Sequence, residues 1–417
     1  MRDHERLTYG ISLLLTATAA VALTGCQLDV ASPSIIDAST INPTSSAVLL
    51  TMSAQTAFWN GMSLSIVAEG WFSGEAWVTD VNSTSPDIAR RQVTPSTQQQ
   101  SNFIWSPLSR SLAANENVLA LLGGLPGQAS DINVARAAMN SAFTLEHMGQ
   151  AMCQGVILGG PPLTQAQTLD TAITRFKRAI AIATTVGGAT GDTIVKASTV
   201  GLAQAYLQRG NNTSAAVAAA VIPASFVYNA AYVDDLSNRA LVSNRVFSGI
   251  TGTGSPGWVV PPTYQALNDP RVPWVDLKHV ARDTIEAIQS LKYTGFGSPI
   301  RIASGLEASY IVAEANLKLG DHAAALALIP VRRAAGGQSP FTGVSDSEVL
   351  VELMAQRARD FYMEGKHIAD FVRNPTATPY IQPAGTLFYL SSGQSFGDQM
   401  CIPLPLVETQ ANHNFPQ

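Results

Sequence analysis

Cysteine, histidine and charged residues are scarce in this sequence of 417 residues. It contains three cysteines and six histidines, and 13% of its residues are charged, against about 25% in an average globular protein. No histidines or cysteines have the spacing of a zinc site, and basic residues form nothing longer than pairs such as Arg90-Arg91. These shortages argue against a nucleic-acid-binding surface and a structural zinc site. We therefore expect no metal and no other cofactor.

A long apolar run is present at the N-terminus. Arg2 and Arg6 precede an apolar stretch from Ile11 to Leu23, which leads into Thr24-Gly25-Cys26. A basic start, an apolar middle and small residues at the end are typical of a secretory signal. The stretch of 13 residues is shorter than the roughly 20 that a membrane-spanning helix needs. We therefore expect residues 1–25 to be removed as a signal peptide.

The residues around Cys26 match the bacterial lipobox, in which the thiol receives a diacylglycerol. Several acyl chains on one cysteine form a stable membrane anchor. Residues 26–42 are rich in Ser, Pro, Thr and Asp, which is typical of a flexible tether. Gln27 is not the aspartate that commonly retains lipoproteins in the inner membrane. The sequence therefore predicts an outer-membrane lipoprotein, anchored through Cys26.

The two remaining cysteines are Cys153 and Cys401. In an oxidising envelope they can form one disulfide, or they can remain two buried thiols. The sequence does not decide between these alternatives.

An internal repeat indicates the fold. Most of the chain from Ser45 to about Gly336 has a helical pattern, and a second segment repeats a first one without a gap. Small residues before a glycine allow close helix packing, and the glycine ends the first helix of each pair. A further helix pair fits residues 134–157 and 169–184. We predict a mainly α fold, a tetratricopeptide-like helical solenoid over residues 43–417. The repeated positions are Ala203, Ala205, Leu207 and Gly210, aligned with Ala313, Ala315, Leu317 and Gly320.

Two segments interrupt the helical pattern. Residues from about 222 to 300 are rich in proline, glycine and aromatic residues, and we expect an irregular subdomain there, with a helix only near Arg282–Leu291. A helix from about Asp346 to Val372 is predicted to precede an extended C-terminal region, about residues 374–417. Long irregular segments in a compact protein are usually functional.

Several motifs resemble the SusD/RagB family of outer-membrane nutrient-binding lipoproteins. Two departures are Gln356, where the family has an acidic residue, and Lys366, where it has arginine, and both are expected to weaken a buried salt bridge. The chain is also short for the family. The matching motifs are Leu28-Asp29-Val30 with Pro33; Ala135-Arg136 through Gly149 to Gly160-Pro161-Pro162-Leu163; Gln356-Arg357-Ala358-Arg359-Asp360-Phe361 with Glu364-Gly365-Lys366-His367 and Asp370-Phe371; and Ile402-Pro403-Leu404-Pro405 with Glu408, Asn412 and Asn414.

The resemblance implies a function in nutrient uptake. Such a protein captures an oligosaccharide or a peptide at the cell surface and passes it to a TonB-dependent, SusC-like transporter, without breaking a bond. The alternative is a tetratricopeptide-like scaffold lipoprotein that binds another envelope protein and no nutrient.

Sugar capture needs flat aromatic faces with polar groups beside them. Two clusters supply such groups, and Trp258, among glycines and prolines, is the residue that we expect to be exposed. Packing in the core is the alternative for each aromatic residue. The first cluster is Trp71, Phe72 and Trp77 with Asp80 and Asn82; the second is Trp258, Tyr264 and Trp274 with Asn268 and Asp269.

One motif suggests a hydrolase, but its context does not fit. Residues 393–397 satisfy G-x-S-x-G around Ser395. A nucleophile elbow needs a helix directly after the serine, whereas Met400-Cys401-Ile402-Pro403 follows here. We therefore expect no enzyme activity and assign no catalytic residue.

Overall fold

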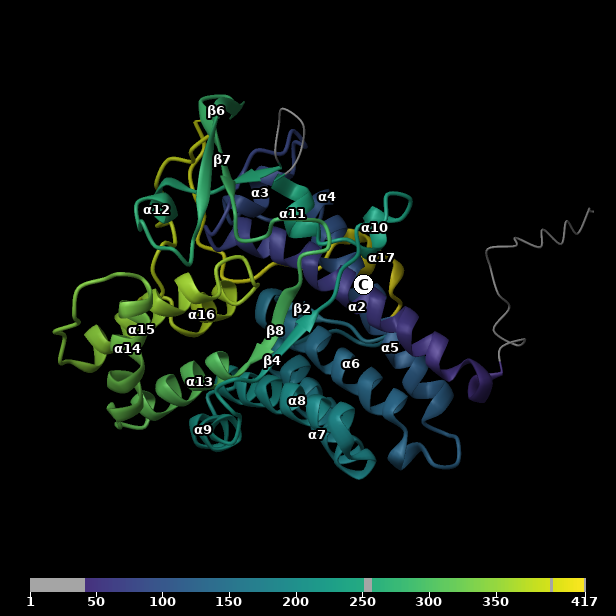
Figure 1. Ribbon diagram of the computed structural model, residues 1–417. Helices are drawn as coiled ribbons and strands as arrows, with labels where there is room; N and C mark the ends of the chain where they lie inside the picture. Colours follow the sequence, from purple (N-terminus) through teal and green to yellow (C-terminus); the bar gives the residue numbers. More distant parts are fainter. Residues whose placement is uncertain (1–41, 251–256, 391–392, 416–417) are drawn as a thin grey trace, which may run out of the picture. The chain divides into compact units, whose positions relative to one another are not determined.

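The computed structural model describes residues 42–250, 257–390 and 393–415 (Figure 1). The predicted signal peptide, Cys26 and nearly all of the predicted tether lie outside these residues. Thr44 to Gln417 forms one compact unit. None of the helices described is long and apolar enough to cross a membrane.

Helices dominate this unit, and consecutive helices pack against one another. Contacts run from α5 through α6, α7, α8 and α9, then from α9 to α13, α14 and α15. In Figure 1, α5 to α8 lie side by side. The predicted mainly α, tetratricopeptide-like architecture is confirmed. The main helices are α2 (Pro43–Phe72), α5 (Ser106–Leu122), α6 (Ile132–Ala151), α7 (Gln165–Val186), α8 (Gly188–Gln208), α9 (Asn212–Ala220), α13 (Gly305–Lys318), α14 (Ala323–Ala335), α15 (Asp346–Asp360), α16 (His367–Arg373) and α17 (Leu406–Ala411).

The sequence repeat corresponds to two helix ends of the same geometry. Gly210 after α8 and Gly320 after α13 have φ of 73° and 87°, in the left-handed region. The N–H of Gly210 donates to the carbonyl of Leu207, and the N–H of Gly320 donates to the carbonyl of Leu317. Together with a second bond from the next residue, this is the Schellman end of a helix. The predicted helix–turn–helix pairs α8–α9 and α13–α14 are therefore confirmed.

The helix predicted for residues 134–157 ends earlier than expected, at Ala151. Met152 forms a parallel bridge with Ile402, and the N–H of Cys153 donates to the carbonyl of Ile402. These contacts with the C-terminal segment hold the backbone extended, and the short strands β2 (Gln154–Gly155) and β3 (Leu163–Thr164) follow.

An insertion between α9 and α13 carries most of the strands. Two short pairs are antiparallel: β4 (Val227–Ala230) with β8 (Ile300–Ser304), and β1 (Trp77–Val78) with β5 (Trp258–Val259). Short helices connect them. These are α10 (Arg239–Val242), α11 (Arg245–Ile250) and α12 (Pro262–Gln265), while α3 (Ser85–Ala89), α4 (Gln98–Gln100), the π-helix η2 (Ser101–Trp105) and the 3-10 helix η3 (Gln128–Ser130) belong to the part before α6.

The helix predicted near Arg282–Leu291 is wrong. Residues Ile285–Ser290 form β7, which pairs antiparallel with β6 (Trp274–Arg282) in a hairpin. Asp283, in the turn, has φ of 53°, a left-handed conformation that a helix cannot contain. Ile285, Ala287 and Ile288 bury their side chains, so packing of the hairpin replaces helical packing.

The single helix predicted from Asp346 to Val372 is also wrong, because α15 and α16 are separate. Met363 and Gly365, between them, have φ of 53° and 71°. A side chain at Gly365 would place its Cβ 2.8 Å from a carboxylate oxygen of Glu69 on α2. The chain therefore turns here to pass close to α2.

Buried ion pairs join α15 to α16 and the turn between them to α13. Arg357 on α15 lies 2.9 Å from Asp370 on α16, and Lys366 lies 2.9 Å from Glu307 on α13. Gln356, the other departure from the family motif, accepts a 2.9 Å hydrogen bond from Arg271. Both departures thus retain polar partners in the structure.

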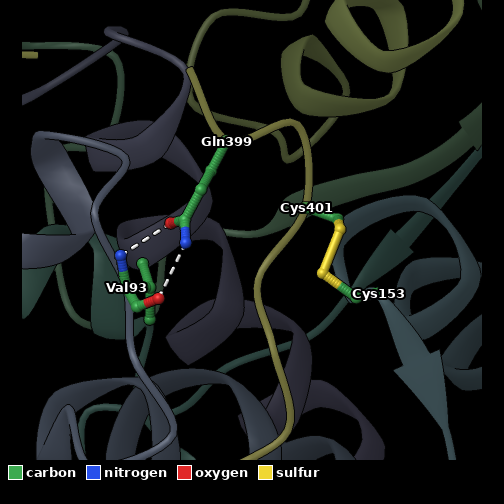
Figure 2. Close-up of a disulfide and its surroundings, with 4 residues drawn as sticks. All are labelled: Val93, Cys153, Gln399 and Cys401. Atoms are coloured by element: carbon green, nitrogen blue, oxygen red, sulfur yellow. Dashed lines mark hydrogen bonds between the residues drawn. A yellow bond between two sulfur atoms is a disulfide. The ribbon is translucent and has the colours of Figure 1, made fainter. Parts of the chain in front are cut away.

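A disulfide joins Cys153 to Cys401, which settles the alternative that the sequence left open (Figure 2). The side chain of Gln399, two residues before Cys401, makes two bonds to the backbone of Val93. Its amide oxygen accepts from the Val93 N–H at 2.6 Å, and its amide nitrogen donates to the Val93 carbonyl at 2.8 Å. The disulfide and Gln399 therefore attach the C-terminal segment to the end of α6 and to the loop before α4.

Candidate functional site

A pocket of about 270 Å³ lies where the end of α2 meets the β1–β5 pair, η2 and α11. Three aromatic residues, Trp71, Phe103 and Trp258, contribute to its wall, and Asp80 and Arg245 are the charged residues that line it. The structure thus brings together two residues of the first predicted cluster and one of the second.

Trp71 is the last but one residue of α2, and its ring packs on the π-helix η2. Its ring lies 5.1 Å from that of Phe103, with the planes at 58°. The side chain is 2% exposed, and its indole N–H has no hydrogen-bond partner among the described residues. A buried N–H without an acceptor is costly, so an acceptor group of a ligand would satisfy it.

Trp258 is fully buried, so the expectation that it is exposed is wrong. Helix α11 covers this side chain, and the indole N–H of Trp258 donates to the carbonyl of Val246 on α11 at 3.2 Å. A Cβ at Gly249 would lie 2.8 Å from the indole ring, so glycine is required there. The ring is held in place by these contacts and still contributes to the pocket wall.

The carboxylate of Asp80 organises its own loop. It accepts hydrogen bonds from the N–H of Asn82 at 3.1 Å, the hydroxyl of Ser85 at 2.6 Å and the amide of Gln99 at 3.2 Å. Asn82 in turn accepts from the backbone and the hydroxyl of Thr84. Asp80 therefore lines the pocket while its carboxylate oxygens are already occupied.

Arg245, at the start of α11, was not predicted from the sequence. One terminal nitrogen donates to the carbonyl of Ala240 at 3.0 Å, whereas its buried Nε has no hydrogen-bond partner in the described part of the chain. No carboxylate lies within ion-pair distance of Arg245 among the residues that the structure describes. Burial lowers the pKa of the guanidinium, with no neighbouring charge to oppose the effect. Phe103 was missed as well, and nothing in the sequence near either residue points to the pocket.

Trp77 lies on β1, next to the pocket-lining segment. It is half-buried and stacks on Tyr389 of the C-terminal region, with ring centroids 4.1 Å apart and planes at 8°. The hydroxyl of Tyr389 accepts a 2.6 Å hydrogen bond from the N–H of Val78, and burial raises the pKa of Tyr389. Phe72, by contrast, belongs to the hydrophobic core.

The other members of the second cluster do not line the pocket. Tyr264 is fully buried, and its ring lies 4.8 Å from Tyr362 and 4.8 Å from Tyr380. Asp269 is a buried carboxylate 2.6 Å from the guanidinium of Arg271. The remaining two are Trp274, half-buried at the start of β6, and Asn268, with φ of 47° in the turn before it.

Ser395 has none of the surroundings of a nucleophile elbow. It forms an antiparallel bridge with Leu387, and its carbonyl accepts from the side chain of Gln92. The next helix, α17, begins only at Leu406.

Comparison with known proteins places the fold. No protein-family model matches the sequence, and no curated protein matches it. Solved structures do match: a SusD superfamily protein from Parabacteroides distasonis aligns over 90% of this chain and 99% of its own, with a TM-score of 0.67 and 15% identity. A surface glycan-binding protein A from Bacteroides uniformis aligns over 88% and 98%, with a TM-score of 0.67 and 15% identity. A laminarin-binding SusD-like protein aligns over 88% and 97%, with a TM-score of 0.65 and 15% identity.

These matches cover nearly the whole chain on both sides. The protein therefore has the SusD-like fold, and the resemblance found in the sequence motifs is confirmed at the level of the fold.

Proposed function

We propose that this protein is a member of the SusD/RagB family that captures a glycan at the outer surface of the cell, with its binding site at the pocket between α2, β1–β5, η2 and α11. The observation that carries the proposal is the meeting of Trp71, Phe103 and Trp258 in one pocket of a SusD-like fold. The names of two structural neighbours, the laminarin-binding and the surface glycan-binding protein, support a glycan over a peptide.

The pocket suits one sugar ring. Its volume of about 270 Å³ lies just below the range of about 300–1,000 Å³ that is usual for ligand pockets. Apolar sugar faces pack on aromatic rings, while sugar hydroxyls reach nearby polar groups. Trp77 and Trp274 are both half-buried outside the pocket lining, and we propose them as further aromatic contacts for the rest of an oligosaccharide. Tyr264 has no part in the proposed site because it does not line the pocket and its ring packs against Tyr362 and Tyr380.

A glycan array followed by calorimetric titration of the bound glycan tests the proposal. Trp71→Ala removes an aromatic face from the pocket and is expected to weaken binding at least tenfold, as the loss of about 1.5–3 kcal/mol of buried apolar contact would do. Trp59→Ala is the matched control: Trp59 is half-buried on the same helix, 12 residues earlier, which is about 18 Å along the axis. Equal affinity of both variants and the wild type would move the site elsewhere, and binding of peptides alone would replace the glycan with a peptide.

The wider role in the proposal is delivery. The protein, anchored through Cys26, passes its ligand unchanged to a TonB-dependent, SusC-like transporter, and it breaks no bond. Purification from native membranes, with mass spectrometry of co-purifying proteins, tests the partner. Cys26→Ser tests the anchor: it is expected to abolish palmitate labelling and to release the protein from the membrane fraction.

A second candidate function, binding of another envelope protein, is favoured by a different groove. It has a volume of about 450 Å³, lies between α9, α13 and α14, and is lined by apolar residues such as Ile222, Val312 and Leu328. Val331 in this lining is 60% exposed. Val331→Lys is expected to remove a protein partner from the membrane purification and to leave glycan binding unchanged. An unaltered set of partners would remove the support for this function.

A further inference from the structure

Resting on the proposed glycan-binding function, we infer that the pocket selects an acidic sugar, with the carboxylate of a uronic acid residue held between Arg245 and the indole N–H of Trp71. The inference concerns the class of glycan and not the capture function itself.

Several buried or partly buried arginines of this protein have an anionic partner, which Arg245 lacks among the described residues. The guanidinium of Arg373 lies 2.6 Å from Glu314, that of Arg301 lies 2.9 Å from Glu364, and that of Arg332 lies 2.6 Å from Asp360. Arg245 has one bond to a backbone carbonyl, and its buried Nε has no partner among the described residues. A partly buried charge without a counter-charge is costly, so a ligand anion would supply what the fold leaves out.

The second unsatisfied group in the same pocket is also a donor. The indole nitrogen of Trp71 can only donate a hydrogen bond, and a guanidinium has no acceptor either. Both residues line one pocket, and the indole nitrogen of Trp71 and the Nε of Arg245 have no hydrogen-bond partner in the described part of the chain. The matching ligand group is one that accepts hydrogen bonds and donates none. An ionised carboxylate is such a group, whereas a sugar hydroxyl also donates.

The charges around the pocket do not oppose an anion. Asp80 is the acidic residue of the lining, but its carboxylate already accepts hydrogen bonds from its own loop. The guanidinium of Arg282, on β6, donates to the main-chain oxygen of Asp80 and forms no ion pair with any described residue. The charged residues of the lining are thus Asp80 and Arg245, and the guanidinium of Arg282 lies beside the main chain of Asp80.

The test is an array of glycans in which each uronic-acid-containing glycan is paired with its methyl-esterified counterpart. The wild type is expected to prefer the acid of each bound pair. Arg245→Gln is expected to weaken binding of the acid about 10- to 100-fold, as the loss of a charge-assisted hydrogen bond does, and to leave the ester nearly unchanged. Affinity for the acid is also expected to fall with rising salt.

Two further variants keep the test decisive. Trp71→Phe retains the aromatic face but removes the N–H, and it is expected to reduce the preference for the acid several-fold. Arg110→Gln is the matched control, because Arg110 lines the separate groove between α2 and α5. Circular dichroism and the thermal midpoint verify that each variant is folded.

The outcomes separate the two proposals. Equal binding of acid and ester, unchanged in Arg245→Gln, overturns the acidic-sugar inference and leaves glycan capture standing. Binding of no glycan by folded protein overturns both. The inference is also overturned if Arg110→Gln removes the preference for the acid while Arg245→Gln retains it.

Discussion

The carboxyl group of Glu75 makes stability depend on pH in a way that can be measured. Its side chain is 1% exposed, one oxygen accepts a 2.9 Å hydrogen bond from the N–H of Met363, and the other has no partner among the described residues. Burial raises the pKa of Glu75 from 4.5 to about 8, and the bond from Met363 and the charge of Lys292 oppose the rise only in part. The carboxyl group of Glu75 is therefore protonated in the folded protein below a pH of about 8.

The direction of the effect follows from proton uptake. Between pH 4.5 and about 8, the folded state holds the Glu75 proton and the unfolded state has lost it. The free energy of unfolding therefore falls as pH rises, by about 1.4 kcal/mol per pH unit. At pH 7 the accumulated loss is on the order of 3 kcal/mol, and this part of the stability is fully present only below pH 4.5.

Glu75→Gln removes this proton and keeps the acceptor for Met363. In urea unfolding at pH 5, 6, 7 and 8, the free energy of unfolding of the variant is expected to rise relative to that of the wild type by about 1.4 kcal/mol per pH unit. An unpaired amide N–H₂ adds a constant cost of about 1–3 kcal/mol that does not alter this slope. Glu286→Gln, at an exposed position of β7, is the control. A difference between wild type and Glu75→Gln that stays constant across the four pH values would refute the reasoning.

Three further predictions concern the fold. Replacing Cys153 and Cys401 by serine opens a loop with a sequence separation of 248 and is expected to cost about 2–5 kcal/mol, measured by urea unfolding with the single serine variants as controls. Gly249→Ala is expected to cost about 1–3 kcal/mol because its Cβ would lie 2.8 Å from the indole of Trp258; an unchanged thermal midpoint and tryptophan fluorescence would contradict this. Burial lowers the pKa of His367 from 6.5 to about 4, so the stability that it contributes above pH 6.5 is lost as pH falls towards 4. In His367→Gln, the melting temperature is expected to fall less steeply than in the wild type as pH decreases over that range. An equally steep fall in both proteins would contradict this prediction.

The helical scaffold was predictable because its signals are local. Gly210 and Gly320 each end a helix through bonds to carbonyls a few residues earlier, so the pattern is contained in one short stretch of sequence. The hairpin β6–β7 was missed although its two strands are adjacent in the sequence. Ile285 and Ile288 have a spacing that also fits a helix, so periodicity alone did not distinguish the two structures.

The candidate site was predictable only in part. Trp71, Asp80 and Trp258 stand out for their chemistry, which the sequence shows directly. Arg245 and Phe103 matter because of what surrounds them: one lacks a carboxylate nearby among the described residues, and the other packs on Trp71 from a π-helix. Such properties arise when distant segments meet, so composition and periodicity do not reveal them. The exposure expected for Trp258 failed for the same reason, since the covering helix α11 has no signal next to the tryptophan.

The pocket walls come from stretches around residues 64–80, residue 103, residues 245–249 and residues 257–258, which come together only in the native fold. The unfolded chain consequently does not form this pocket, so a ligand that binds there stabilises the native state alone. A compound present at a hundred times its dissociation constant would add about 2.7 kcal/mol to the native state. Simple melting curves, recorded against a library of soluble sugars, can therefore identify the natural cargo from the rise in melting temperature alone.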